Sequence, residues 1–143
     1  MQGITITDQT TDGFLAVNLI DILQAIGPLL LTTKWQFTNL ECFGKTAESL
    51  YSYADSSSYI SGEILVQLAA KITQVIDGKF QAYRGNENQP WLIITAVDSS
   101  AYDVETVDEN ILVKLRQQFQ QVSELPGNIS LMPKLLTVLH TGD

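Results

Sequence analysis

An almost unbroken apolar run at residues 91–97 constrains the fold of this chain more than any other feature. It reads Trp-Leu-Ile-Ile-Thr-Ala-Val and is bounded by Pro90 on one side and by Asp98 and two serines on the other. A run of this length, rich in β-branched residues, is typical of a strand, and proline and small polar residues commonly end one. Because apolar residues occupy odd and even positions alike, both faces of the strand are expected to be covered. The run therefore predicts the central strand of a sheet.

Two strand-like segments lie close to this run in sequence. Residues 79–84 precede it across a polar loop, and residues 102–106 follow it after a short turn. Strands joined by short connections usually pair with their neighbours in antiparallel order. Residues 79–106 are therefore predicted to form an antiparallel meander. Residues 3–7 are predicted to form a short edge strand, and residues 33–40 are predicted to join the sheet near an edge.

Apolar residues recur at helical spacing in three further segments, which predicts helices near residues 18–27, 62–77 and 107–122. Ser61 and Thr106 are placed to cap the second and the third of these helices. Helices that pack over a mainly antiparallel sheet define the α+β class. The sequence thus predicts an α+β fold.

The length of the chain, 143 residues, is that of one domain, so residues 1–143 are predicted to form a single globular unit. The pattern of residues 46–54 fits a helix and a strand equally and leaves the choice open. Residues 126–143 form a tail that begins with a Pro-Gly turn and contains several apolar residues. We expect the tail to dock on the sheet or to exchange between two subunits, and we expect a homodimer through the sheet face or through this tail.

Charge and composition exclude several classes of function. With 16 acidic and 8 basic residues, the formal charge is −8, which disfavours nucleic acid and anionic membrane surfaces as partners. No apolar stretch approaches the roughly 20 residues that a membrane-spanning helix needs. The first residues lack the basic start and apolar core of a signal peptide, and Cys42 is the single cysteine. A cytoplasmic location is therefore expected.

Residues 39–46, Asn-Leu-Glu-Cys-Phe-Gly-Lys-Thr, resemble a damaged P-loop. Asn39 replaces the first glycine of that motif, and Glu41 would put a carboxylate where the loop binds phosphate. A P-loop domain also requires a parallel sheet, whereas the predicted meander is antiparallel. We interpret these residues as an ordinary loop, with nucleotide binding as the weaker alternative.

Catalytic residues are not indicated by the sequence. Cys42 and His140 are the only residues of their types, and neither has a local partner that would make a nucleophile and base pair. The Gly-x-Ser-x-Gly pattern of a serine nucleophile does not occur. We interpret Cys42 as a packed thiol and His140 as an exposed imidazole, and we predict no catalytic residue and no cofactor.

Carboxylates are concentrated between Gly85 and Val113, where no lysine or arginine occurs. The candidate site residues in this stretch are Asp98, Asp103, Glu105, Asp108 and Glu109. Structural roles explain many of them: Asp98 begins a turn, and Asp108 and Glu109 favour a helix start. Asp103 and Glu105 would share the outer face of a strand about 7 Å apart, where charge prevents aggregation. The functional interpretation is an acidic face that attracts a basic protein partner.

Two functional hypotheses follow. The first is a small acidic protein-binding or regulatory module without catalytic activity. The alternative is a ligand-binding or enzymatic domain with an unidentified pocket, in which the acidic cluster would bind a divalent cation or, as a weaker option, the chain would bind a nucleotide. A shallow, continuous acidic patch would favour the first hypothesis, and a deep apolar pocket with convergent polar groups would favour the second.

Overall fold

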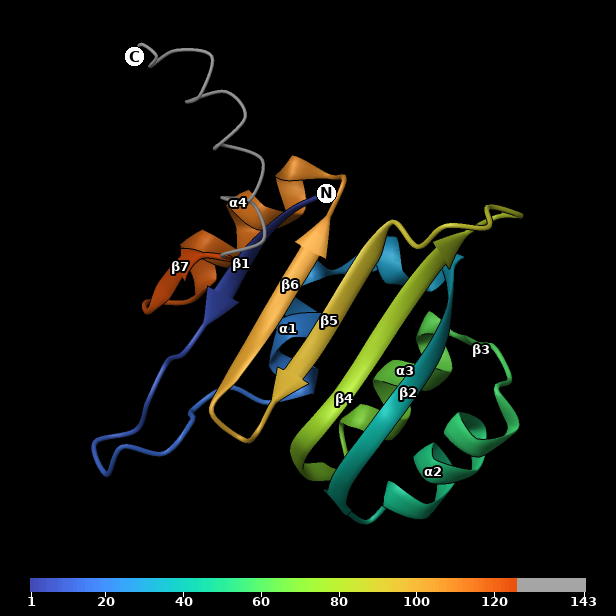
Figure 1. Cartoon of the computed structure of the whole chain (residues 1–143), viewed down its shortest axis with the longest axis horizontal. Helices are drawn as coiled ribbons and strands as arrows, with labels where there is room; N and C mark the ends of the chain where they lie inside the picture. The colour runs from blue at the N-terminus through green and yellow to red at the C-terminus, as the bar shows by residue number, and fades with distance from the viewer. Residues whose placement is uncertain (126–143) are drawn as a thin grey trace, which may run out of the picture.

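Seven strands form one antiparallel sheet in the computed structural model of the chain, which describes residues 1–125 (Figure 1). Their order across the sheet is β3-β2-β4-β5-β6-β1-β7. The strands are β1 (Gln2–Ile6), β2 (Thr33–Gly44), β3 (Ile60–Ser61), β4 (Ile72–Arg84), β5 (Leu92–Val97), β6 (Ala101–Thr106) and β7 (Val122–Glu124). The helices are α1 (Leu19–Ile26), α2 (Ala47–Ser56), α3 (Gly62–Ala69) and α4 (Glu109–Gln118), with the 3-10 helix η1 (Pro28–Thr32) after α1. The predicted α+β class with a mainly antiparallel sheet is confirmed.

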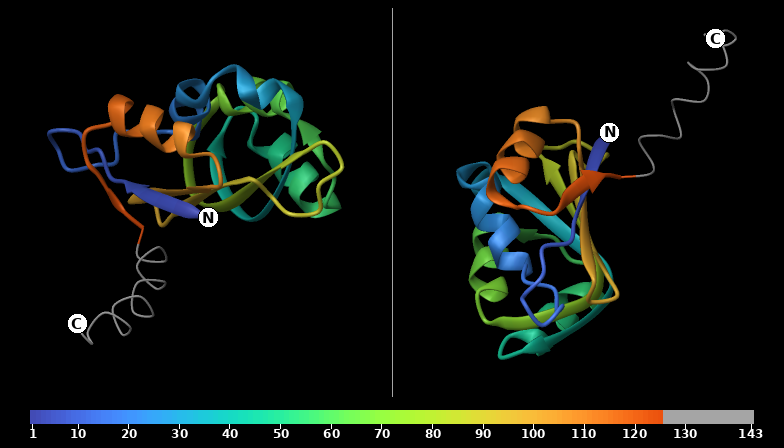
Figure 2. Two further views of the ribbon diagram at one scale, coloured as in Figure 1. Left: turned by 90° about the horizontal axis from the view of Figure 1, so that it is seen from above. Right: turned by 90° about the vertical axis from the view of Figure 1, so that its left-hand side faces the viewer.

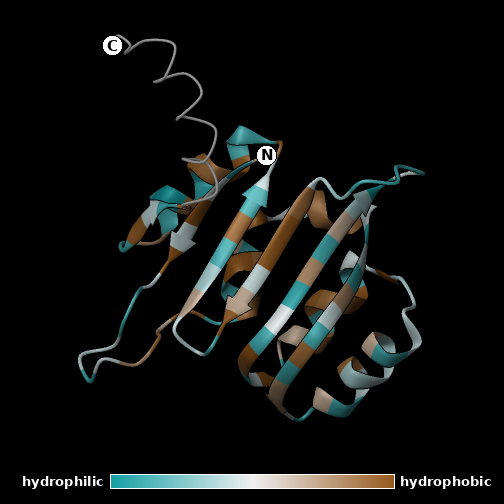
Figure 3. Ribbon diagram, viewed as in Figure 1, coloured by the Kyte–Doolittle hydropathy of each residue, from teal (hydrophilic) through white to brown (hydrophobic). Residues whose placement is uncertain are grey.

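The predicted central strand is also confirmed, because β5 lies in the middle of the strand order. It pairs with β4 on one side and with β6 on the other, so residues 79–106 form the predicted meander. Apolar and hydrophilic residues alternate along β4 and β6, whereas β5 is mostly apolar (Figure 3). The expectation of an edge strand at residues 3–7 is wrong: β1 lies between β6 and the short strand β7, and it pairs with both.

Helices α1, α3 and α4 cover one face of the sheet (Figure 2). Ile94 at the centre of β5 is fully buried on this face, together with Leu65 of α3 and Leu115 of α4. Each such side chain contributes about 1.5 to 3 kcal/mol to folding relative to its exposed form. The two helices that were predicted before and after the meander therefore pack on the same face, over one core.

The opposite face of the sheet carries no helix within residues 1–125 (Figure 2). Ile93 and Thr95 of β5 point to this side and are half-buried, and Val97 is 38% exposed. The neighbouring side chains on β4 and β6 are Lys79, Gln81, Asp103 and Glu105. We name these side chains of β4, β5 and β6 the open face. The expectation that both faces of β5 are covered is therefore met on the helical face only, for the part of the chain that the structure describes.

The predicted helix over residues 62–77 is too long. Ser61 caps its start as expected, because the Ser61 hydroxyl accepts a hydrogen bond from the Ile64 N–H at 3.2 Å. The helix ends at Ala69, however, and residues 72–77 are the beginning of β4, where they pair with β2. The β-branched side chains in this segment favour the extended conformation.

The other two predicted helices are confirmed in place. The helix near residues 18–27 is α1, and the helix near 107–122 is the shorter α4. Asp108 rather than Thr106 caps α4, because the Asp108 carboxylate accepts a hydrogen bond from the Asn110 N–H at 3.0 Å. Thr106 fixes the backbone just before the helix, since its hydroxyl oxygen accepts a hydrogen bond from the Asp108 N–H at 3.0 Å.

The undecided segment at residues 46–54 is the helix α2, which lies beside the part of β2 that the short strand β3 does not reach (Figure 1). Leu50 attaches this helix to the core and is fully buried. The predicted tail at residues 126–143 lies outside the described residues. None of the described helices is long and apolar enough to cross a membrane.

Candidate functional site

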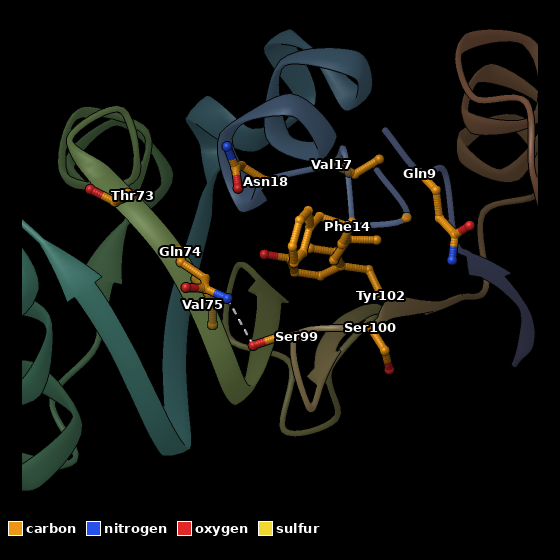
Figure 4. A pocket seen from close by; sticks show the side chains of 12 residues that line it. Gln9, Phe14, Val17, Asn18, Thr73, Gln74, Val75, Ser99, Ser100 and Tyr102 are labelled. Atoms are coloured by element: carbon orange, nitrogen blue, oxygen red, sulfur yellow. Dashed lines mark hydrogen bonds between the residues drawn. The ribbon is translucent and has the colours of Figure 1, made fainter. Parts of the chain in front are cut away.

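A cleft of about 480 Å³ lies at the end of the sheet where β5 turns into β6 (Figure 4). One wall is the segment before and at the start of α1, and the other is formed by the start of β4 and by the β5–β6 turn. Its polar lining consists of Gln9, Asn18, Thr73, Gln74, Ser99 and Ser100. Its larger apolar lining residues are Phe14, Leu15, Val17, Val75 and Tyr102. None of the described lining residues carries a charge, and we name this site the Phe14 cleft.

Phe14 belongs to a hydrogen-bonded hairpin. The Ala16 N–H donates to the Asp8 carbonyl at 2.7 Å, and the Thr10 N–H donates to the Phe14 carbonyl at 2.7 Å. Gly13 completes the turn with a φ of 86°, a conformation that glycine adopts at no steric cost. The Phe14 side chain is nevertheless 72% exposed. The backbone bonds therefore hold a large aromatic ring in solvent at the mouth of the cleft.

The β5–β6 turn on the other side of the cleft has a strained backbone. Asp98 and Ser99 have φ values of 47° and 57°, in the left-handed region that serine rarely adopts. The neighbouring strand holds the turn, because the Asp98 N–H donates to the Asp77 carboxylate at 2.9 Å and the Ser99 N–H donates to the Ile76 carbonyl at 3.0 Å. The Gln74 amide also donates to the Ser99 hydroxyl at 3.0 Å (Figure 4). Strain of this kind is concentrated at binding and catalytic sites.

Tyr102 lines the cleft from β6 and is almost completely buried. Burial is the main cause that raises the pKa of its phenol far above the usual range. A hydrogen bond with the Leu19 backbone at the start of α1 lowers the pKa, and the negative charge of Asp21 raises it. Tyr102 is therefore a neutral phenol at physiological pH that links the sheet to α1.

The five carboxylates predicted as site residues lie in three separate places. Asp98 is in the β5–β6 turn, next to residues that line the Phe14 cleft. Asp103 and Glu105 point to the open face from β6, as expected from the burial of their neighbours. Asp108 caps α4, and Glu109 is exposed in its first turn. Because β6 separates the turn from the helix by about 20 Å, the five side chains do not form one continuous patch.

The carboxylates on the open face already have defined surroundings. Asp103 accepts a hydrogen bond from the Thr5 hydroxyl of β1 at 2.7 Å. Glu105 lies opposite Ile93 of β5 and Gly3 of β1. Within residues 1–125, no group of three or more histidine, cysteine, aspartate or glutamate side chains is placed to hold a metal ion. The divalent-cation alternative therefore finds no cluster of ligands in the described structure.

The P-loop-like residues 39–46 form neither a phosphate-binding loop nor the ordinary loop expected from the sequence. Most of them belong to β2 and run alongside β4. Cys42 in this segment is buried, and burial raises the pKa of its thiol, while a hydrogen bond with Tyr51 lowers it. His140, the other half of the possible catalytic pair, lies outside the described residues.

Sequence reasoning did not identify Phe14, Gln74 or Ser99 as site residues. The polar run before Gly13 and the Asp-Ser-Ser that follows the central strand are both recognisable as turns. Nothing in either turn indicates that the fold brings them to the same end of the sheet, beside the first residues of β4. Contacts between segments so far apart in sequence are invisible to local patterns.

Similarity to known proteins gives no further guide to this site. The functional conclusion therefore depends on the geometry of the Phe14 cleft and on the charges around it. No family model, no curated protein and no solved structure matches the chain.

Proposed function

We propose that this chain is a protein-binding module without catalytic activity, and that it receives a basic segment of its partner in the Phe14 cleft. The observation that carries the proposal is the Phe14 hairpin, which is fixed by backbone hydrogen bonds while the ring is 72% exposed. Aromatic residues are enriched in the cores of protein interfaces and often dominate their binding energy. Complete burial of this ring by a partner would contribute about 1.5 to 3 kcal/mol.

The polar lining of the cleft suits a peptide. Gln9, Asn18 and Gln74 carry amide groups that both donate and accept hydrogen bonds, and the serine hydroxyls of the β5–β6 turn do the same. These neutral groups match the N–H and C=O groups of a peptide backbone. Because none of the described lining residues is charged, the basic side chains of the partner would lie at the rim of the cleft and its backbone and apolar groups inside.

Negative charge flanks this neutral lining. Asp12 adjoins Gly13 in the hairpin turn, and Asp77 and Asp98 lie together at the β5–β6 turn. The whole chain carries a formal charge of −8. Carboxylates around a binding site accelerate encounters with basic partners and disfavour acidic ones. Among the five carboxylates predicted from the sequence, Asp98 is the one that we assign to this cleft.

The nature of the buried polar groups supports a non-catalytic role. Apart from buried tyrosine, tryptophan and cysteine side chains, Thr33 and Thr106 are the buried side chains with polar groups among the described residues. The Thr33 hydroxyl donates to the Leu30 carbonyl at 2.7 Å, and the Thr106 hydroxyl donates to the Trp91 carbonyl at 2.7 Å. Both hydroxyls are thus used in local structure. Neither belongs to a pair of groups suited to acid–base chemistry.

Selection of random displayed peptides on the immobilised chain tests this proposal. We expect the recovered peptides to combine lysine or arginine with an apolar residue, and to bind more weakly as salt screens the charges. Phe14→Ser should abolish recovery. Phe43→Ser is the matched control, since Phe43 is 56% exposed on β2 and does not line the cleft. Equal recovery by the Phe14→Ser variant, or peptides without basic residues, would contradict the proposal.

Asp98→Asn provides a second arm of the same experiment. Asparagine tolerates the left-handed backbone of the turn, so this change removes the charge and keeps the conformation. The selected peptides should bind this variant with a smaller salt dependence than they show with the wild type.

A small neutral ligand is the second candidate for the same cleft. The volume of about 480 Å³ lies within the range of small-molecule pockets. A thermal-shift screen with uncharged polar compounds would test it. A compound that raises the melting temperature of the wild type but not of Gln74→Leu would favour this candidate over a peptide.

A further inference from the structure

We propose that a second copy of this chain binds to the open face, so that two sheets pack face to face about a two-fold axis parallel to β5. The register places opposite charges at equal distances from the central strand. Thr95 of β5 pairs with Lys79 of β4 on one side and with Asp103 of β6 on the other. The open face is therefore basic on one side of β5 and acidic on the other, along the same row.

A two-fold axis above β5 exchanges these two sides. Lys79 of one copy then faces Asp103 of the partner subunit, and symmetry repeats the contact in the opposite sense. The next row follows the same rule, because Ile93 pairs with Gln81 on one side and with Glu105 on the other. An amide therefore faces a carboxylate across the interface. The open face is complementary to itself.

Lys79 and Asp103 do not satisfy each other within one chain. Two strand spacings, about 10 Å, separate their backbones. Neither residue takes part in an ion pair among residues 1–125. Asp103 accepts one hydrogen bond from Thr5 and keeps further acceptor capacity, and Lys79 is exposed. Both charges are thus available to another molecule.

Two apolar side chains of β5 flank Thr95 in the middle of the open face. Ile93 is half-buried and Val97 is 38% exposed along the same side of β5. An apolar centre between polar and charged flanks is the usual arrangement of a protein interface. Facing sheets pack about 10 Å apart, close enough for long side chains from both to meet.

The proposed dimer leaves the Phe14 cleft accessible. Val75 and Tyr102 line the cleft and belong to the buried core on the helical side of the sheet. The dimer interface is on the opposite side and does not depend on the function proposed for the cleft.

Charge reversal tests the dimer on the full chain by sedimentation at micromolar concentration. The wild type should be a dimer. Lys79→Asp and Asp103→Lys should each weaken dimerisation by at least about tenfold, because symmetry places two like-charge contacts in each homodimer. The double variant should recover the dimer. An equimolar mixture of the two single variants should also recover it, since every contact then joins opposite charges.

Lys71→Asp is the matched control, because Lys71 is exposed between α3 and β4 and does not belong to the open face. It should dimerise like the wild type. Melting curves of each variant show whether it is folded, which matters for Asp103→Lys because it loses the bond from Thr5. A monomeric wild type would overturn the proposal. So would a dimer that both reversals leave unchanged, or a failure of both the double variant and the mixture to recover it.

Discussion

Tyr51 makes both of the hydrogen bonds that a neighbouring strand would make with Cys42. The Cys42 N–H donates to the Tyr51 hydroxyl oxygen at 2.8 Å, and that hydroxyl donates to the Cys42 carbonyl at 3.2 Å. Strand β3 pairs with β2 only at Lys34 and Trp35, which leaves the rest of β2 without a strand on that side. Open edges promote aggregation. Helix α2 therefore closes this edge in part through a single side chain.

Tyr51→Phe should destabilise the protein by about 1 to 3 kcal/mol, because two backbone groups of Cys42 lose their partner in a partly buried place. Tyr53→Phe is the control on the same helix. The Tyr53 hydroxyl makes no hydrogen bond within the described structure, so this change should cost less than about 0.5 kcal/mol. Urea unfolding measures both. Equal losses would show that Tyr51 acts through its ring rather than through its hydroxyl.

Leu65 and Leu68 both lie on helix α3, but they differ in how deeply the structure buries them. Leu65 is fully buried, whereas Leu68 is half-buried at the edge of the core. Leu65→Ala should therefore cost about 2 to 5 kcal/mol of unfolding free energy, and Leu68→Ala should cost less. Denaturant melting of the two variants gives the comparison. A larger loss at Leu68 would contradict the packing described for this helix.

The extra length predicted for that helix has a physical cause. Ile72, Val75 and Gly78 of β4 are buried at intervals of three residues. A regular strand buries every second residue, so an interval of three reads as one face of a helix. The interval arises because the register of β4 against β2 shifts between Glu41 and Cys42 and again between Phe43 and Gly44, and each shift adds one residue to β4. These shifts depend on a partner strand that is distant in sequence, and no local pattern in β4 contains them.

The candidate sites also depend on contacts that local sequence patterns do not contain. The central strand and the meander are predictable because they depend on composition and on short connections. The acidic stretch is equally visible in sequence, but a strand and a turn separate Asp98 from Asp108 in space. The Phe14 cleft is not predictable in this way, because hairpin, strand and turn meet there only after the sheet has formed.

Alkaline pH should destabilise the protein through Tyr102. Burial raises the pKa of its phenol above the ordinary value of 10.0, so the unfolded state releases this proton while the folded state keeps it. The contribution is constant below about pH 10 and falls as the pH rises above that value. Burial also raises the pKa of the Cys42 thiol above 9.0, which moves the onset of the decline toward lower pH.

Urea unfolding of wild type and Tyr102→Phe, measured from about pH 8 to pH 11, tests this expectation. The variant should lose stability less steeply above pH 10, although it is less stable at neutral pH because it lacks the bond to Leu19. Parallel slopes in the two proteins would mean that Tyr102 does not titrate on unfolding in this range.

Ser99→Gly should make the protein more stable and its cleft less effective. Ser99 has a φ of 57°, which glycine adopts without the cost that a side chain brings. The relief of backbone strain should raise the free energy of unfolding by about 1 kcal/mol. The loss of the solvent-exposed hydrogen bond from the Gln74 amide to the Ser99 hydroxyl reduces this gain. Ser100→Gly is the control, since Ser100 has no positive φ, and it should be neutral or destabilising. Thermal melting of the two variants and the wild type measures the change in stability.

Binding of the peptides selected on the wild type tests the effect of Ser99→Gly on the cleft. This variant should bind them more weakly, because it removes one of the hydroxyls that line the cleft. A variant that gained stability and bound as tightly as the wild type would separate the strained turn from the binding site.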